Sequence, residues 1–307
     1  MEQIIEQKDA ITSVLYLYYA CAQIDLIVMP EQEIIETIEL YPILDGKLIE
    51  LLESLSPEEW NAQTIAGKWT VKDIVAHILD GCYLRRLSIH RDGYFGENPE
   101  NINSFQGLVN YLDSLNAVAV NAHKRLSPKL LISLIKIYSR EVYEFFKTLE
   151  PRGRAIFPVN WAGEKESENW FDIARDYTER WHHQQQIRLA VGRFGIDMRE
   201  LYFPVLDTFM RALPQTYQAI AAEKSTVLQF TISGEAGGDW YLSMTDKGWA
   251  LVKETNQTPV SRTTIPQEIA WRVFTKGIDR ESAKSQSKVE GSENLGTEIF
   301  NMVSIMG

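Results

Sequence analysis

The spacing of apolar residues changes at Gly195, and this change is the feature that most constrains the fold. Between residues 31 and 195, apolar side chains recur every three or four positions, as in amphipathic helices. Beyond residue 198 come short runs rich in β-branched and aromatic residues, separated by Gly and Asp. The sequence therefore predicts a two-domain α+β chain, with a helix bundle over 31–195 and a small α+β domain over 198–307.

Cap residues help to place the bundle helices. Thr70 is a predicted N-cap with Asp73 in the first turn, and Ser127 with Pro128 begins another helix. A later helix is expected to end at Gly192 or Gly195. The predicted helical segments of the bundle are 33–55, 70–93, 104–126, 127–150 and 169–195. In the second domain we expect helices over 202–221, 266–277 and 295–307, and strands within 225–234, 238–246, 247–255 and 259–266.

Residues 1–30 form an N-terminal extension of uncertain role. Twenty mostly apolar residues run from Ala10 to Met29, which is long enough to span a bilayer. Asp25 lies within this run and the preceding flank is acidic, so membrane insertion is disfavoured and no signal peptide is clear. A packed helix, a strand or a leader ahead of a start at Met29 remain the alternatives.

Charge and cysteine content exclude several functional classes. The chain has 31 Lys and Arg against 42 Asp and Glu, a net charge of −11, which argues against binding to nucleic acid or to anionic lipid. Its two cysteines, Cys21 and Cys82, cannot form a disulfide framework and neither lies in a CxxC motif. A reducing compartment, and hence a cytoplasmic location, fits this composition.

Histidine is scarce, and two of the five histidines lie in one predicted helix. Glu179 and His183 are four residues apart and therefore share a helix face, so both can reach one metal ion. His77 lies within an apolar helix and is the best candidate for a third ligand from a facing helix. His182 is expected to point about 100° away from His183.

Two plainer interpretations of these residues stay open. A histidine in an apolar stripe is often a hydrogen-bonded core residue, and a Glu–His pair at this spacing is often a surface pair. His90 and His123 lie near predicted helix ends, where exposure to solvent is the expectation.

Two motifs resemble a known family. W-T-V-K-D-I-V-A-H at 69–77 and E-R-W-H-H-Q-Q-Q-I-R-L-A-V-G at 179–192 are similar to motifs of the DinB-like superfamily, and more closely to those of the mycothiol-dependent maleylpyruvate isomerases. The resemblance covers about residues 34–307. It implies a DinB-like four-helix bundle, followed by a small α+β domain similar to sterol carrier protein. It also implies that His77, Glu179 and His183 bind a divalent metal ion.

The resemblance implies an enzyme with a small-molecule substrate. A metal ion held by two imidazoles and one carboxylate would deprotonate a bound low-molecular-weight thiol for isomerisation or S-transfer to a small electrophile. Metal-bound water acting in hydrolysis, or a metal- or ligand-binding stress protein without turnover, are the alternatives. Zinc suits this donor set, although nickel, iron and manganese also accept it. The thiol would be a diffusible cosubstrate, since neither cysteine has an obvious base beside it.

The second domain offers a weaker substrate-binding prediction. In the related isomerases this domain contributes basic side chains that bind substrate carboxylates. Arg272 and Lys276 are the nearest candidates, and their spacing predicts one helix face. An ordinary solvent-exposed face is the alternative. A homodimer is one expectation for the assembly, because free faces of such bundles often pair.

Overall fold

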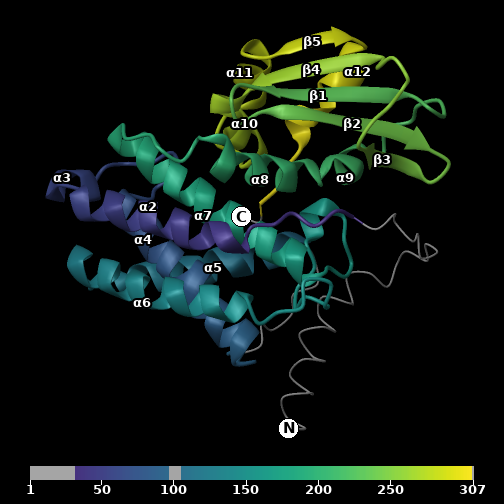
Figure 1. Ribbon diagram of the computed structural model, residues 1–307. Helices are drawn as coiled ribbons and strands as arrows, with labels where there is room; N and C mark the ends of the chain where they lie inside the picture. Colours follow the sequence, from purple (N-terminus) through teal and green to yellow (C-terminus); the bar gives the residue numbers. More distant parts are fainter. Residues whose placement is uncertain (1–31, 97–104, 306–307) are drawn as a thin grey trace.

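The computed structural model describes residues 32–96 and 105–305, and the apolar segment Ala10–Met29 lies outside them. The described chain has a helical body on one side and a sheet on the other, with α8, α9 and α10 between the two (Figure 1). Within the described residues, no helix combines the length and the apolar character that crossing a bilayer requires.

Four helical segments pack against one another to form the bundle. They are α2, α4 with its continuation, α6 and α7, while α5 lies against α4 (Figure 1). The predicted four-helix bundle is therefore confirmed. The bounds of the elements in this part are η1 Ile38–Leu40, α2 Tyr41–Ser54, α3 Pro57–Trp60, α4 Val71–His77, η2 Ile78–Leu84, η3 Leu87–Arg91, α5 Phe105–His123, α6 Pro128–Phe146, η4 Asn160–Ala162 and α7 Asn169–Val191.

The predicted caps fix the two helices that carry the site. Thr70 forms a capping box: its hydroxyl accepts from the Asp73 amide, and the Asp73 carboxylate accepts from the Thr70 amide at 3.0 Å. The helix α7 ends at Gly192, whose φ of 66° suits a residue without a side chain. Of the two glycines predicted to end this helix, Gly192 is therefore the one that does.

The segment after His77 differs from its prediction. A single α-helix was expected over 70–93, but η2 and η3 are π-helical. A π-helix has more residues in each turn than an α-helix, and such turns are frequent at functional sites. The apolar spacing could not reveal the change, because residues three to five apart still fall on one face.

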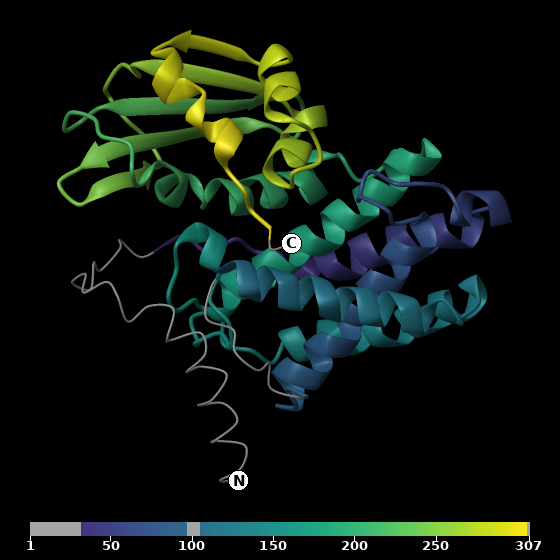
Figure 2. The same ribbon diagram turned by 180° about the vertical axis from the view of Figure 1, so that it is seen from behind.

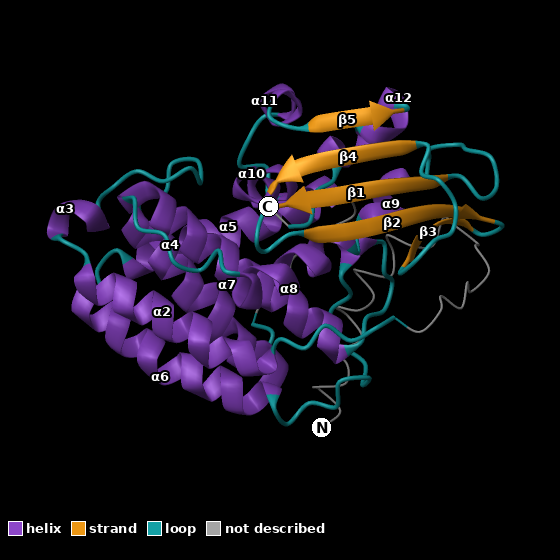
Figure 3. Cartoon of the chain, turned by 45° about the horizontal axis from the view of Figure 1, so that its top comes forward, coloured by secondary structure: helices purple, strands orange, loops and turns teal. Residues whose placement is uncertain are grey.

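The second part of the chain contains a five-stranded sheet with strand order β3-β2-β1-β4-β5 (Figure 3). The pair β1–β4 is parallel and the other pairs are antiparallel. The bounds are β1 Val227–Ser233, β2 Gly238–Thr245, β3 Gly248–Val252, β4 Ser261–Pro266 and β5 Lys288–Gly291. The four predicted strands are confirmed, whereas β5 was missed because its four mostly polar residues lie at the sheet edge.

Several helices of this part are shorter than predicted. They are α8 Arg199–Met210, α9 Leu213–Tyr217, α10 Gln267–Phe274, α11 Arg280–Ser285, α12 Glu293–Gly296 and η5 Glu298–Asn301. The single helix expected over 202–221 is two, since a new helix, α9, begins at Leu213 with Pro214 in its first turn. The expected closing helix over 295–307 is wrong: after η5 the chain is extended and returns to the bundle side (Figure 2), where the Ser304 amide donates to the Phe274 carbonyl at 2.9 Å.

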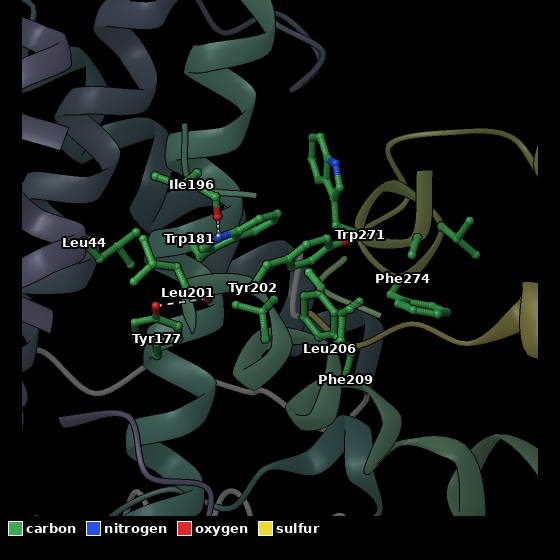
Figure 4. Packing of buried hydrophobic residues seen from close by; sticks show 14 of the residues in the cluster. Leu44, Tyr177, Trp181, Ile196, Leu201, Tyr202, Leu206, Phe209, Trp271 and Phe274 are labelled. Atoms are coloured by element: carbon green, nitrogen blue, oxygen red, sulfur yellow. Dashed lines mark hydrogen bonds between the residues drawn. The ribbon is translucent and has the colours of Figure 1, made fainter. Parts of the chain in front are cut away.

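A continuous apolar core joins the bundle to the sheet side. The Trp181 ring of α7 stacks on Tyr202 of α8, with centroids 4.2 Å apart, and meets Trp271 of α10 edge-on at 6.2 Å (Figure 4). The Trp181 indole N–H donates to the Ile196 carbonyl at 2.8 Å, so its one polar atom is satisfied. The contact between Trp181 and Trp271 thus joins α10 to the middle of α7.

Candidate metal centre

The middle of α7 gathers three potential metal ligands within one helical turn. Ligand atoms of Glu179, His182 and His183 all lie within 4.8 Å of one another. The Glu179 carboxylate is 3.6 Å from Nε2 of His183 and 3.8 Å from Nδ1 of His182. The structure therefore keeps His182 close to the predicted pair, although the helical geometry suggested that it would point elsewhere.

His77 approaches the same group from α4. Its ring meets the His183 ring edge-on, with centroids 4.6 Å apart, and the Trp69 ring lies 4.8 Å from it on the other side. The buried Nδ1 atom of His77 has no hydrogen-bond partner among the described residues. Two facing helices thus bring the His77 ring against His183, which contacts Glu179 on α7. These are the three residues that sequence spacing and family resemblance had selected, although the ligand atoms that lie within 4.8 Å of one another are those of the α7 residues.

Hydrogen bonds on α7 orient both of its imidazoles. Nδ1 of His183 lies 3.0 Å from Oε1 of Gln186, so this nitrogen is the donor and the lone pair of His183 is on Nε2, facing Glu179. Nδ1 of His182 lies 3.1 Å from the Thr178 carbonyl, which likewise leaves the lone pair on Nε2. A partner that fixes the tautomer in this way is typical of histidines that ligate metals.

Burial keeps the imidazoles neutral. It lowers the pKa of His183 to about 3, with a further contribution from neighbouring His182, and that of His182 to about 4. The pKa of His77 is also well below its ordinary value, first through burial and then through His183 and Arg85. Burial raises the pKa of Glu179, while His183 and Arg175 oppose that rise. Neutral imidazoles have their lone pairs available, which is the state that a metal ion requires.

Sequence reasoning missed two side chains of this site. Gln186 orients His183, and Trp69 forms a wall beside His77. The three-residue spacing of His183 and Gln186 on one helix was the available signal for the first. Trp69 lies ahead of the helix, so its contact depends on the loop fold, which spacing does not predict.

The other histidines also differ from expectation. His90 is buried, not exposed at a helix end: its ring nitrogens lie 2.9 and 3.2 Å from an Arg86 nitrogen, and the Asp172 carboxylate is 3.6 Å away. Burial and the charge of Arg86 lower the pKa of His90 to about 3. Nδ1 of His123 is buried as well, and it has no partner among the described residues. The π-helical turn at Leu87–Arg91 belongs to the segment that was mispredicted, and it carries His90.

The two basic residues predicted in the second domain do not share a helix face. Arg272 lies in the last turn of α10, but that helix ends at Phe274. Lys276 lies beyond it with a φ of 57°, a left-handed conformation that stops the helix. A side chain at Gly277 would lie 3.3 Å from both Arg272 and Ile65, so this turn touches the loop that leads to Trp69. Arg272 is thus held on the side of the second domain that faces the bundle.

The comparisons with known proteins agree with this architecture. Residues 46–136 match the family model described as the DinB superfamily, a range that includes His77. The crystal structure of a histidine-to-alanine mutant of the mycothiol-dependent maleylpyruvate isomerase matches with a TM-score of 0.50 and 10% identity, covering 83% of this chain and 92% of that one. The family match supports the predicted superfamily for residues 46–136. The structural match confirms the two-part α+β fold, and identity this low shows the fold alone.

Two further solved structures are more distant. A second structure of mycothiol-dependent maleylpyruvate isomerase matches with a TM-score of 0.46 and 11% identity, over 77% of this chain and 86% of that one. The solution structure of sterol carrier protein domain 2 of Helicoverpa armigera matches with a TM-score of 0.24 and 14% identity, over 35% of this chain and 87% of that one. None of the curated protein sequences matches the chain significantly.

Proposed function

Because residues 46–136 belong to the DinB superfamily and the chain has the fold of a maleylpyruvate isomerase, we propose that it is a metal-dependent enzyme that uses a low-molecular-weight thiol. Its reaction would be S-transfer to, or isomerisation of, a small electrophile. The ligands would be His77, Glu179 and His183. The observation that carries the proposal is the approach of the His77 and His183 rings across two helices, to centroids 4.6 Å apart, with Glu179 one turn away.

The donor set fits a divalent ion, and zinc in particular. Two neutral imidazoles and one carboxylate form a set that zinc uses at catalytic sites, with a position left for another molecule. The unpartnered Nδ1 of His77 and the Nε2 lone pair of His183 are donors that no described protein atom uses well. When bound, such an ion would lower the pKa of a thiol, or of water, that occupies the remaining position.

The chain's own residues supply orientation and exclude a competing nucleophile. Gln186 holds the His183 ring with Nε2 toward Glu179, and Trp69 covers one side of His77. Cys82 is buried, and burial together with the charge of Asp176 raises the pKa of its thiol. A thiol of this kind is unreactive, which supports a diffusible thiol as the cosubstrate.

Arg272 is the basic residue that we propose for substrate recognition in the second domain, with Lys276 beside it in the turn that follows. The packing of Trp271 on Trp181 seats α10 on the site-bearing helix, next to Arg272. Either cation would pair with a carboxylate of the substrate. A cytoplasmic location and a homodimer remain predictions from the sequence.

Metal analysis of purified variants tests the site first. We expect His77→Ala and His183→Ala to lose the bound divalent ion, as measured by elemental analysis and calorimetric titration. His182→Gln is the matched control, because its imidazole lies beside the same carboxylate but is not a proposed ligand. If both alanine variants keep full metal content, the assignment is wrong. Loss in His182→Gln and His183→Ala, but not in His77→Ala, would move the site to the three α7 residues.

A thiol panel then tests the reaction. We expect turnover of a chloro-aromatic electrophile by the metal-loaded protein only when a low-molecular-weight thiol is present. Equal turnover without thiol would favour hydrolysis and overturn the transferase proposal. Saturable ligand binding with no turnover under any condition would favour a binding protein.

A further inference from the structure

We propose that Arg85 forms a carboxylate-binding subsite beside the candidate metal centre. This inference rests on the proposed function and deepens it, since it predicts an acidic substrate or thiol cosubstrate. No sequence motif pointed to Arg85, and the DinB match and the structural matches do not assign it a role.

Gly81 allows the Arg85 guanidinium to lie next to His77. A side chain at position 81 would place its Cβ 3.2 Å from Nη2 of Arg85 and 3.6 Å from Cε1 of His77. Both groups therefore reach the same small volume, which only a glycine leaves open.

Two neighbouring elements hold the Arg85 head group in place. Nε of Arg85 lies 3.1 Å from the Asp80 carboxylate, and Nη2 donates to Oδ1 of Asn116 on α5 at 2.9 Å. Nη1 has no partner among the described residues, and the side chain is 30% exposed. The guanidinium is thus oriented in advance and keeps donors for a ligand, which lowers the entropic cost of binding.

The adjacent Arg86 shows what a purely structural arginine looks like here. Its three nitrogens contact Asp172, Asp176 and His90 at 2.7 to 3.2 Å, and only 6% of its side chain is exposed. Arg85 instead has one carboxylate partner, Asp80, and 30% of its side chain is exposed. A planar guanidinium with a free edge recognises a carboxylate in preference to a neutral group.

The π-helical segment explains why these groups meet. In a regular α-helix, residues 77 and 85 would differ by about 80° around the axis. The segment Ile78–Leu84 is π-helical. Its turns contain more residues than those of an α-helix, so each residue rotates the chain by a smaller angle around the axis. Arg85 follows directly and can therefore lie over the same face as His77.

Calorimetric titration with three probes of similar size tests the subsite. Mercaptosuccinate carries a thiol and two carboxylates, thioglycerol carries the thiol alone, and succinate carries the carboxylates alone. We expect Arg85→Gln to weaken the binding of mercaptosuccinate and succinate to the metal-loaded protein by about tenfold to a hundredfold. Thioglycerol and metal affinity should be unchanged, and Arg85→Lys should keep part of the carboxylate binding.

Two further variants sharpen the result. Gly81→Ala keeps the charge of Arg85 but should displace its guanidinium and weaken mercaptosuccinate binding. Arg91→Gln is the matched control. It removes an exposed arginine of η3 that pairs with Glu141 of α6, and it should leave the binding of all three probes unchanged. Thermal unfolding of each variant checks that the fold is kept.

The possible failures are distinguishable. Unchanged mercaptosuccinate and succinate binding in Arg85→Gln, or an equal loss for thioglycerol, would overturn the subsite. A wild-type chain that takes up no metal would contradict the proposed function instead. In that case succinate still tests Arg85 directly, and wild-type protein that binds no succinate would overturn the subsite as well.

Discussion

Helix α7 contributes to two polar clusters, and protein atoms satisfy only one of them. The first, which we term the ionic network, consists of Asp45, Arg86, Asp172, Asp176 and Arg180. Within it, Arg180 donates to both Asp45 and Asp176 at 2.9 and 3.0 Å, and its guanidinium lies 4.5 Å from two tyrosine rings. The second is the candidate metal centre, which contains no arginine and leaves imidazole lone pairs unused.

This difference separates a structural cluster from a binding cluster. Buried charges are tolerated when every one is paired, and the ionic network meets that condition. The candidate metal centre is equally inaccessible at His182 and His183, yet its nearest carboxylate contacts are 3.6 and 3.8 Å, longer than hydrogen bonds. An external ligand gains the most binding free energy at a cluster whose polar groups lack protein partners.

The largest effect is expected in the ionic network. Arg180→Met would leave Asp45 and Asp176 buried without their shared partner, and it should lower the free energy of unfolding by about 3 to 5 kcal/mol. Chemical denaturation of metal-free protein measures this. Glu179→Gln is the comparison from the other cluster, and it should change stability by less than about 1 kcal/mol, because burial already disfavours that charge. Equal losses in the two variants would abolish the distinction between the clusters.

The next effect concerns the orientation of His183. Gln186→Leu removes the acceptor that fixes the His183 tautomer, so metal affinity should fall about tenfold to a hundredfold. Competition with a chelating dye measures the affinity. Gln185→Leu is the matched control, since its buried Oε1 has no hydrogen-bond partner among the described residues. A similar loss in both variants would indicate a general change in the helix instead.

The smallest effect, taken per pH unit, is a pH dependence of the stability of metal-free protein. His182 and His183 have pKa values of about 4 and 3 when folded, whereas unfolded histidine titrates near 6.5. The unfolded chain therefore binds more protons below pH 6.5, and stability should fall as the pH drops toward 4. Each imidazole contributes at most about 1.4 kcal/mol per pH unit. Denaturation curves of His183→Gln between pH 6.5 and 4 should show a shallower decline, and an unchanged decline would contradict the neutral imidazole.

The sequence predicted the parts of this molecule that depend on local pattern. Thr70, Ser127 and Gly192 fixed helix ends, and the change of apolar spacing located the sheet. Glu179 and His183 share a face because they lie in one regular helix, which spacing alone predicts. His77 was selected as a third ligand because it lies within an apolar helix, and the family resemblance supported that choice. No local pattern places α4 against α7.

Contacts that depend on irregular backbone were not predictable. Arg85 meets His77 only because the intervening turns are π-helical and Gly81 has no side chain. His90 lies against Arg86, four residues earlier, and against Asp172, which is far along the chain; a position near a helix end does not reveal the second contact. Lys276 was placed on a helix that in fact ends two residues earlier.

Three consecutive residues of α7 contact three different parts of the molecule. Arg180 enters the ionic network, Trp181 enters the packing with Tyr202 and Trp271, and His182 faces the candidate metal centre. The rings that cover Trp181 belong to α8 and α10, beyond Gly195. A bundle expressed without residues after 195 would therefore expose an indole in the middle of α7, so the helical part of the chain is not a separable module.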